Sequence, residues 1–126
     1  LMDHDSPVMN GDGSYSRDFT YIDNVIEMNI RAMLTDNKDA LNTVYNVAFG
    51  ERTDLNELVN ILKEELSQFD EKIAQVEVKY GPKRAGDVPH SLASIDRARE
   101  RVGYNPEFSI KDGLKEAMAW YWKNLK

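Results

Sequence analysis

Short β-prone runs that alternate with amphipathic helical repeats constrain the fold of this chain most. Residues 43–49 form a nearly continuous apolar run ending at Gly50, which is typical of a strand buried on both faces of a parallel sheet. Residues 17–22 and 76–80 are runs of alternating character, as in half-buried strands. Helical patterns separate these strands, so we predict an α/β fold with a small sheet of about three strands and about four helices.

Capping residues and apolar spacing mark the first two expected helices. Asp23 stands at the N-cap position of a helix that continues to about Thr35, because Asp accepts hydrogen bonds from the free N–H groups of a first turn. The residues at helical spacing within it are Ile26, Ile30, Met33 and Leu34. Asp54 followed by Glu57 forms a capping-box pattern, which opens a second helix whose apolar stripe extends to Phe69.

Two further helices follow an irregular loop, residues 81–89, that contains two prolines and two glycines. The first of them covers about residues 95–102, because Gly103 fits as its C-terminal stop. The last begins at the capping pair Ser109 and Asp112 and carries an apolar stripe toward the end of the chain.

Composition and charge exclude several classes of partner and site. A length of 126 residues suits one domain, so residues 1–126 are expected to form a single unit. The formal net charge of −6 makes DNA and RNA poor partners, since a basic field supplies most of that affinity. The absence of cysteine excludes disulfides, thiolate zinc sites and cysteine nucleophiles. No apolar run reaches the roughly 18 residues of a membrane-spanning helix, so no membrane partner is expected.

The beginning of the chain lacks the basic and apolar regions of a signal peptide. It starts with Leu1, and residues 2–5 resemble the end of a helix. We therefore expect a fragment of a longer protein. The lack of cysteine also fits a reducing compartment, and the expected localisation is cytoplasmic.

No catalytic or metal-binding constellation is visible in the sequence. His4 and His90 are far apart and belong to no ligand pattern such as H-E-x-x-H, and His90 is expected to be an ordinary loop histidine. Residues 11–13 (GDG) begin like a dinucleotide-binding loop, but a β-prone run follows them in place of a helix. We therefore predict no catalytic, metal-binding or cofactor-binding residues in this chain.

The irregular loop has the chemistry to bind an anion. It carries Lys83, Arg84 and Asp87, and its glycines let the backbone approach a ligand closely. A guanidinium can hold a phosphate with two parallel hydrogen bonds. Arg17, beside a glycine turn and ahead of a helix, is a second candidate. The alternative is that these are surface charges without a ligand.

Four short motifs follow one another along the chain. Residues 11–25 read GDGSYSRDFTYIDNV, residues 44–50 read VYNVAFG, and residues 84–88 read RAGDV. Residues 103–121 contain GYNP, GL and WY in that order. Together they resemble motifs of the extended short-chain dehydrogenase/reductase family, in its nucleotide-sugar epimerase and dehydratase branch: G-D-G-x-x-x-R-D-F-x-Y-V-x-D-V, V-Y-N-V-G-x-G, R-x-G-D-[VL] and L-G-Y-x-P…G-L…W-Y. Two departures are a first motif one residue shorter and Ala48 in place of a glycine.

This resemblance implies the C-terminal, substrate-binding part of an NAD-dependent nucleotide-sugar enzyme whose Rossmann half is missing here. Within the family the chain is similar to UDP-N-acetylglucosamine 4-epimerases, mainly because of its GDGSYSRDF run. A UDP-glucose or UDP-glucuronate 4-epimerase, or a dTDP-sugar dehydratase, shares most of these motifs and stays an alternative. The family also suggests a role in polysaccharide biosynthesis.

The resemblance further implies roles for individual residues. Arg17 and Arg84 would bind the diphosphate of a UDP-sugar. Asp87 would hydrogen-bond the ribose or orient Arg84. Asn46 would lie on the strand that ends beside the cofactor-binding half. The alternative is that Arg84 and Asp87 pair with each other only to hold their loop.

The family's N-terminal glycine loop and its Tyr-x-x-x-Lys catalytic pair are absent from this sequence. NAD is therefore expected in the complete enzyme only, and the chain by itself should be inactive. A stand-alone binding or interaction module that has lost catalysis is the alternative class. The edge of the expected strand at residues 44–49 would normally lie against the cofactor-binding sheet. We predict that it pairs with another copy, which gives a homo-oligomer or strand exchange.

Overall fold

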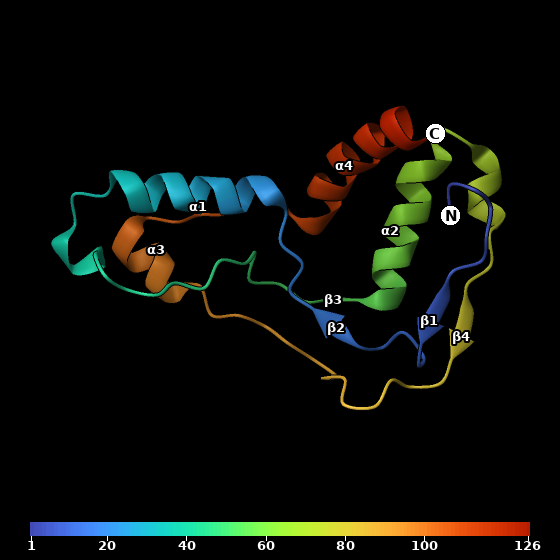
Figure 1. Cartoon of the computed structure of the whole chain (residues 1–126), viewed down its shortest axis with the longest axis horizontal. Coiled ribbons are helices and arrows are strands. Elements are labelled where there is room, and N and C mark those ends of the chain that lie inside the picture. Colours follow the sequence, from blue (N-terminus) through green and yellow to red (C-terminus); the bar gives the residue numbers. More distant parts are fainter.

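The computed structural model describes residues 1–126 (Figure 1). Its helices are α1 (Ile22–Leu34), α2 (Leu55–Ser67), α3 (Asp96–Val102) and α4 (Ile110–Leu125), with two 3-10 helices, η1 (Lys38–Ala40) and η2 (Glu71–Gln75). Its strands are β1 (Val8–Asn10), β2 (Ser16–Arg17), β3 (Thr53–Asp54) and β4 (Lys79–Gly81). The predicted α/β class and the four predicted helices are therefore confirmed.

The strands form two separate two-stranded sheets in place of one sheet of about three strands. β1 and β4 are parallel, with Val8 beside Lys79, and β2 and β3 are antiparallel, with Arg17 beside Thr53. Of the predicted strand at residues 17–22, only Arg17 is in a strand. No sequence pattern marks β1 or β3, because such short strands depend on partners far away in the chain.

Residues 43–49 do not form a strand, so that prediction is wrong for the chain by itself. The backbone N–H groups of residues 43–48 donate to no backbone carbonyl. The N–H groups of Phe49 and Gly50 donate to the carboxylate of Asp18, each at 3.1 Å. A β-prone run becomes a strand only where a neighbouring strand bonds to its backbone, and no strand of this chain pairs with residues 43–48.

Helix α1 begins one residue before the predicted cap. Tyr21 occupies the N-cap position without a side-chain capping bond, and Asp23 lies within the first turn, so the prediction of Asp23 as N-cap is wrong. The ring of Tyr21 lies 5.3 Å from that of Phe108, and a Cβ at Gly113 would come within 2.5 Å of it. Aromatic packing therefore holds the start of α1, and Asp23 contributes through the helix dipole.

The ends of the other helices agree with the sequence patterns. The Asp54 carboxylate accepts the N–H of Glu57 at 2.8 Å, which is half of the predicted capping box of α2. Gly103 ends α3 with φ of 67°, a left-handed conformation that glycine adopts without strain. Ser109 and Asp112 form a complete capping box at the start of α4.

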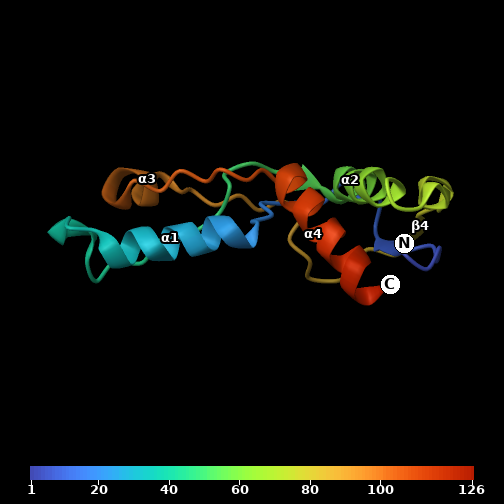
Figure 2. The same ribbon diagram turned by 90° about the horizontal axis from the view of Figure 1, so that it is seen from above.

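Two small apolar clusters, one in each half of an elongated molecule, form the core (Figure 1). The first joins α1, α3 and the segment before Gly50, and consists of Met28, Ala48, Ile95, Ala98 and Tyr104. The second joins α2, η2 and α4, and consists of Leu66, Ile73 and Met118. Figure 2, the view from above, shows the helices in two layers. In that view α1 is drawn below α3, and α4 slants away below α2. Only 18 of the 126 residues are buried, so much apolar surface stays accessible.

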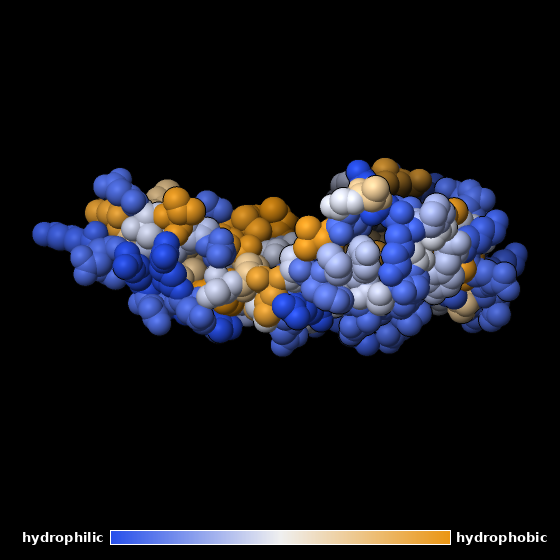
Figure 3. Space-filling model, turned by 90° about the horizontal axis from the view of Figure 1, so that it is seen from below, coloured by the Kyte–Doolittle hydropathy of each residue, from blue (hydrophilic) through white to orange (hydrophobic).

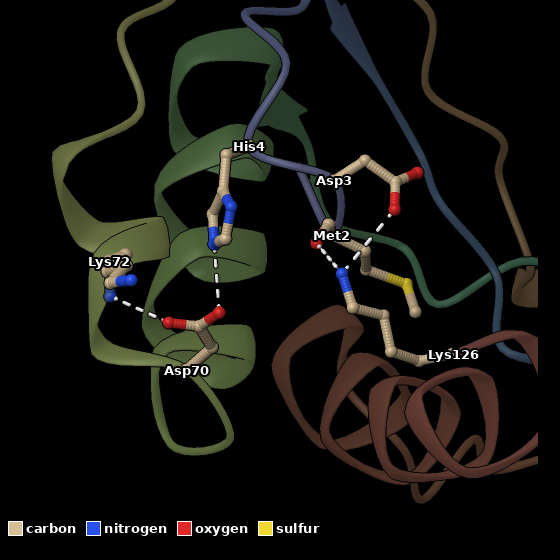
Figure 4. Close-up of polar contacts among 6 residues, drawn as sticks. All are labelled: Met2, Asp3, His4, Asp70, Lys72 and Lys126. Carbon is tan, nitrogen blue, oxygen red and sulfur yellow. Dashed lines mark hydrogen bonds and ion pairs between the residues drawn. The ribbon is translucent and has the colours of Figure 1, made fainter.

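Polar contacts tie the N-terminal turn to the start of η2 and to the end of the chain after α4 (Figure 4). Nε2 of His4 lies 2.8 Å from Oδ2 of Asp70, whose Oδ1 accepts the N–H of Lys72 at 3.0 Å. The bond from Lys72, followed by that from His4, lowers the pKa of Asp70 below its usual range. Nζ of Lys126 donates to the carbonyl of Met2. The first residues are thus joined to the end of α4.

Candidate functional site

The glycine turn ahead of Arg17 follows β1 directly, at residues 11–14, and connects β1 to β2. Gly11 and Gly13 have φ of +80° and +78°, which residues with a Cβ rarely adopt. Asp12 closes the turn by accepting the hydroxyl of Ser14 at 2.6 Å and its N–H at 3.0 Å. These two bonds lower the pKa of Asp12, the hydroxyl most of all. The turn therefore fixes the direction in which β2 begins.

β2 carries Arg17 between β3 and the loop that follows β4. On one side, Ser16 pairs with Asp54 of β3. On the other side, the N–H of Ser16 donates to the carbonyl of Pro89 at 2.9 Å, and its carbonyl accepts the N–H of Ser91 at 3.2 Å. The backbone beside Arg17 is therefore held along both edges.

The guanidinium of Arg17 is bound by Asp87, 70 residues away in the sequence. Nη2 of Arg17 donates to Oδ1 of Asp87 at 2.6 Å, and Nη1 donates to the carbonyls of Ser16 at 2.8 Å and Pro89 at 3.4 Å. These bonds use three N–H donors and leave the rest of the guanidinium free for another acceptor. Both side chains are 31% exposed, so a ligand can reach the pair.

Arg84 lies in the same loop, exposed, and its guanidinium makes no hydrogen bond or ion pair. The N–H of Asp87 donates to the carbonyl of Arg84 at 3.4 Å, but the carboxylate of Asp87 is bonded to Arg17. The alternative pairing of Arg84 with Asp87 is therefore not formed. Lys83 extends over the ring of Tyr15, with its Nζ 5.5 Å from the ring centroid. The loop thus presents two cations next to the Arg17–Asp87 pair.

Asn46 lies apart from this loop. Its Nδ2 donates to the carbonyl of Ser94 at 3.1 Å, and together with Val44 and Arg97 these two residues line a pocket of about 250 Å³. No hydrogen bond joins Asn46 to either predicted diphosphate-binding arginine. Within this chain, the structure brings Arg17 and Asp87 together and leaves Asn46 outside their contacts.

Asp18 is a positioning residue to which the sequence prediction assigns no role. Its carboxylate accepts the N–H groups of Phe49 and Gly50, and so ties the residue after Arg17 to the end of the segment that carries Asn46. The available signal was its place in the R-D-F motif, directly after Arg17. Its partners, however, are backbone N–H groups, which every residue except proline has. No oppositely charged residue in the sequence therefore reveals them.

Ser16 and His90 form a hydroxyl–imidazole pair in the same region. Oγ of Ser16 lies 3.0 Å from Nδ1 of His90. Such a pair activates a nucleophile only when the hydroxyl is accessible and a third group orients the base. Ser16 is only 6% exposed, and no carboxylate bonds to His90. The pair therefore connects β2 to its neighbouring loop, and His90 is the loop histidine that the sequence predicts.

The glycine turn offers no cradle for a dinucleotide. A Cβ at Gly13 would lie 2.2 Å from Oδ1 of Asn56 and 2.5 Å from the sulfur of Met9, so side chains already fill the space beside it. A strand, and not a helix, follows the turn. The N-terminus of α2 meets the turn, but its N–H groups of Leu55 and Asn56 already donate to the carbonyl of Gly13 at 3.0 and 3.3 Å, so they are not free to bind a pyrophosphate. The residues present do not fit NAD. The structure also contains no group of three or more potential metal ligands, and none of its helices combines the length and apolar character needed to cross a membrane.

The fold matches the C-terminal part of NAD-dependent epimerases of the extended short-chain dehydrogenase/reductase type. The chain belongs to the GDP-mannose 4,6 dehydratase family, whose model matches residues 2–117. The predicted membership of the nucleotide-sugar epimerase and dehydratase branch is therefore confirmed.

Three relatives illustrate this similarity. A putative UDP-glucose 4-epimerase of Methanocaldococcus jannaschii is 32% identical over 124 residues, which are 98% of this chain and 37% of the relative. The structure of UDP-N-acetylglucosamine 4-epimerase from Methanobrevibacter ruminantium in complex with UDP-N-acetylmuramic acid is 32% identical, with a TM-score of 0.82 over 97% of this chain and 36% of that one. The UDP-glucuronic acid 4-epimerase of Bacillus cereus, in complex with UDP-glucuronic acid and NAD, is 26% identical, with a TM-score of 0.78 over 99% and 37%.

The chain spans little more than a third of the length of these relatives. What their names and bound molecules describe is therefore a property of proteins nearly three times as long.

Proposed function

We propose that this chain is the substrate-binding part of an NAD-dependent UDP-sugar 4-epimerase, with UDP-N-acetylglucosamine as the substrate. The observation that carries the proposal is the ion pair between Arg17 and Asp87, which joins two of the family's motifs across 70 residues. Relatives with the same fold are complexes with UDP-N-acetylmuramic acid and UDP-glucuronic acid, so a UDP-sugar is the ligand class that they have in common.

Arg17 and Arg84 hold the diphosphate in this proposal. A diphosphate carries about two negative charges, and charge-assisted bidentate contacts to phosphate are among the stronger hydrogen bonds of proteins. Arg17 has free donors after it binds Asp87, and Arg84 has no other partner in the structure. A chain with a net charge of −6 offers phosphate few other favourable surfaces, so the cations of the loop would dominate its recognition.

Asp87 acts through Arg17 and not through Arg84. Its carboxylate restrains the Arg17 side chain, so less conformational entropy is lost when the guanidinium binds phosphate. Asp18 supports the same arrangement from the next residue, by holding the backbone at Gly50. Asn46 would reach the ligand only from the other side of the substrate, beside the cofactor-binding part of the longer protein.

Catalysis belongs to the longer protein in this proposal. The chain has no Tyr-x-x-x-Lys pair and no site that fits NAD, which would accept and return the hydride of an epimerisation in the complete enzyme. The chain by itself is therefore expected not to react, and to bind a UDP-sugar weakly at most. A retained NAD-dependent epimerase activity of this chain would contradict the proposal.

Calorimetry tests the binding role. UDP, UDP-N-acetylglucosamine and UDP-glucose are titrated into the native chain and into Arg17→Ala and Arg84→Ala, with Arg101→Ala as a matched control on an exposed arginine outside the loop. Hydrogen bonds to charged groups are worth about 1.5–3 kcal/mol, so Arg17→Ala and Arg84→Ala should each weaken UDP binding at least about tenfold. The control should bind as the native chain does.

Three outcomes separate the alternatives. Tighter binding of the N-acetylated sugar than of UDP-glucose supports the substrate assignment, and the reverse order favours a UDP-glucose epimerase. UDP binding that Arg84→Ala and Arg17→Ala leave unchanged overturns the diphosphate site. A folded native chain that binds none of the three ligands would mean that the pocket needs the part of the longer protein that this chain lacks, or that Arg17 and Arg84 do not hold the diphosphate.

A further inference from the structure

Hydrogen bonds, and not apolar packing, hold the loop at residues 82–91 against the rest of the chain. Of these residues only Asp87 is half-buried, and neither apolar cluster includes any of them. The loop runs along the lower margin of the molecule in Figure 1, and Figure 3, the view from below, shows a largely hydrophilic surface over the right-hand part where it lies. The few polar contacts that the loop makes therefore fix its position.

Two of the three hydrogen-bond acceptors of the Arg17 guanidinium belong to this loop. They are the carboxylate of Asp87, at 2.6 Å, and the carbonyl of Pro89, at 3.4 Å. The carbonyl of Pro89 also accepts the N–H of Ser16 at 2.9 Å, and the carbonyl of Ser16 accepts the N–H of Ser91 at 3.2 Å. Arg17 therefore keeps these two acceptors only while β2 stays paired with the loop.

His90 supplies a further link between β2 and the loop. Its Nδ1 lies 3.0 Å from Oγ of Ser16, and the residues on either side of it, Pro89 and Ser91, make the two backbone bonds. Ser16 is only 6% exposed, and its hydroxyl makes no other hydrogen bond. A buried donor without an acceptor is costly, so the hydroxyl donates to Nδ1. The neutral imidazole therefore carries its proton on Nε2.

We propose that His90 is a positioning residue for Arg17 and acts through Ser16. The imidazole binds the hydroxyl of Ser16, this bond secures the pairing of β2 with the loop, and the pairing keeps Pro89 and Asp87 against the guanidinium. The role belongs to the ligand-free chain, so it holds whether or not the chain binds UDP. Only its consequence for nucleotide affinity rests on the proposed function.

Nuclear magnetic resonance of the ligand-free chain tests this proposal. The Nη protons of an arginine give separate signals when hydrogen bonds hinder rotation of the guanidinium, and averaged signals when it rotates freely. Arg17 should give separate signals in the native chain and averaged ones in His90→Ala. His90→Asn should restore the separate signals, because its Oδ1 can accept from Ser16 at the place of Nδ1. His4→Ala, which changes the other of the two histidines, is the matched control and should leave Arg17 unchanged.

Hydrogen exchange separates this role from a general loosening of the fold. The N–H groups of Ser16 and Ser91 should exchange at least about tenfold faster in His90→Ala, whereas those of α2 and α4 should not change. Ser16→Ala should act like His90→Ala, and the double variant should have no larger effect, because both changes remove the same bond.

Calorimetry adds the consequence for the ligand. His90→Ala should weaken UDP binding about threefold or more, but less than Arg17→Ala does, because the guanidinium is still present and only its restraint is lost. A native chain that binds no UDP contradicts the nucleotide assignment, and the magnetic resonance signals of Arg17 still decide the role of His90.

Three results would overturn the proposal. Separate Arg17 signals that persist in His90→Ala would show that Asp87 and the backbone hold the guanidinium by themselves. Averaged signals in both His90→Ala and His90→Asn would mean that an acceptor for the Ser16 hydroxyl is not what matters. Averaged signals already in the native chain would mean that Arg17 is not held at all.

Discussion

Two buried polar side chains hold this thin structure together at the residue scale. Asn24 is 1% exposed, and its Oδ1 accepts the N–H groups of Glu107 and Phe108, both at 3.1 Å, while its Nδ2 donates to the carbonyl of Phe108 at 2.7 Å. Tyr104, equally buried, donates its hydroxyl to the carbonyl of Ala48 at 2.8 Å. Each side chain supplies a backbone partner to a segment that has no regular secondary structure.

Tyr104→Phe should destabilise the chain by about 1–3 kcal/mol, because it leaves the carbonyl of Ala48 without its buried partner. Burial, reinforced by the nearby carboxylates of Glu27 and Asp18, raises the pKa of Tyr104 to about 12. Its contribution to stability is thus fully present below the unfolded pKa of about 10 and is lost as the pH rises through the folded pKa. Urea unfolding from pH 8 to alkaline pH should show this decline in the native chain; an equal decline in Tyr104→Phe would assign it to other groups.

At the scale of the elements, nearby residues in the sequence specify the helices, whereas the strands depend on distant partners. The capping box of α4 joins Ser109 to Asp112, and Asp54 caps α2, so the starts of these two helices are encoded within four residues. The extended segment at residues 43–49 has the apolar pattern of a strand but no neighbour to pair with. Strand formation depends on such a neighbour, which a sequence pattern cannot supply.

Removal of the N-cap side chain of α4 should test whether local hydrogen bonds stabilise the start of this helix. Ser109→Ala should lower the free energy of unfolding by about 1 kcal/mol, since it removes the side-chain acceptor at the N-cap. Lys115→Ala, an exposed change within the same helix, is the control and should have little effect. Thermal unfolding measures both. Equal melting temperatures for Ser109→Ala and the native chain would mean that packing against α2 alone defines the start of α4.

The same cap should make α4 sensitive to acid. The hydroxyl of Ser109, followed by its N–H, lowers the pKa of Asp112. A lowered folded pKa means that this contribution is present above the unfolded pKa of about 3.9 and is lost as the pH falls through the folded value. Asp112→Asn should therefore be less stable than the native chain at neutral pH, with a difference that shrinks in acid below about pH 4.

The whole molecule is divided between two small clusters, so its halves should unfold with some independence. Ile73 has no exposed surface and is the centre of the second cluster. Ile73→Ala should cost about 2–5 kcal/mol, the usual loss for a large-to-small change in a core. Hydrogen exchange should speed up in α2 and α4 and change little in α1 and α3. Uniform acceleration in all four helices would show that the chain unfolds as one unit.

The sequence predicts the residues of the candidate site but not all of their contacts. The motifs mark Arg17, Arg84 and Asp87 as candidates. For the two arginines the chemistry agrees, because a guanidinium beside glycines can bind a phosphate. The partner of Asp87 could not be read in the same way. Asp87 is near Arg84 in the sequence but bonds to Arg17 across 70 residues, since β2 is held against the segment after the loop.

The sequence by itself determined the four helices, three of their caps and the glycine turn, because each depends on hydrogen bonds and backbone preferences within a few residues. Only the tertiary structure decided which strands pair, which arginine Asp87 holds, and that Ile26, Ile30 and Met33 of α1 are exposed in this chain. These features depend on contacts between distant segments. Periodicity shows that a helix has an apolar face, but only packing decides what that face touches.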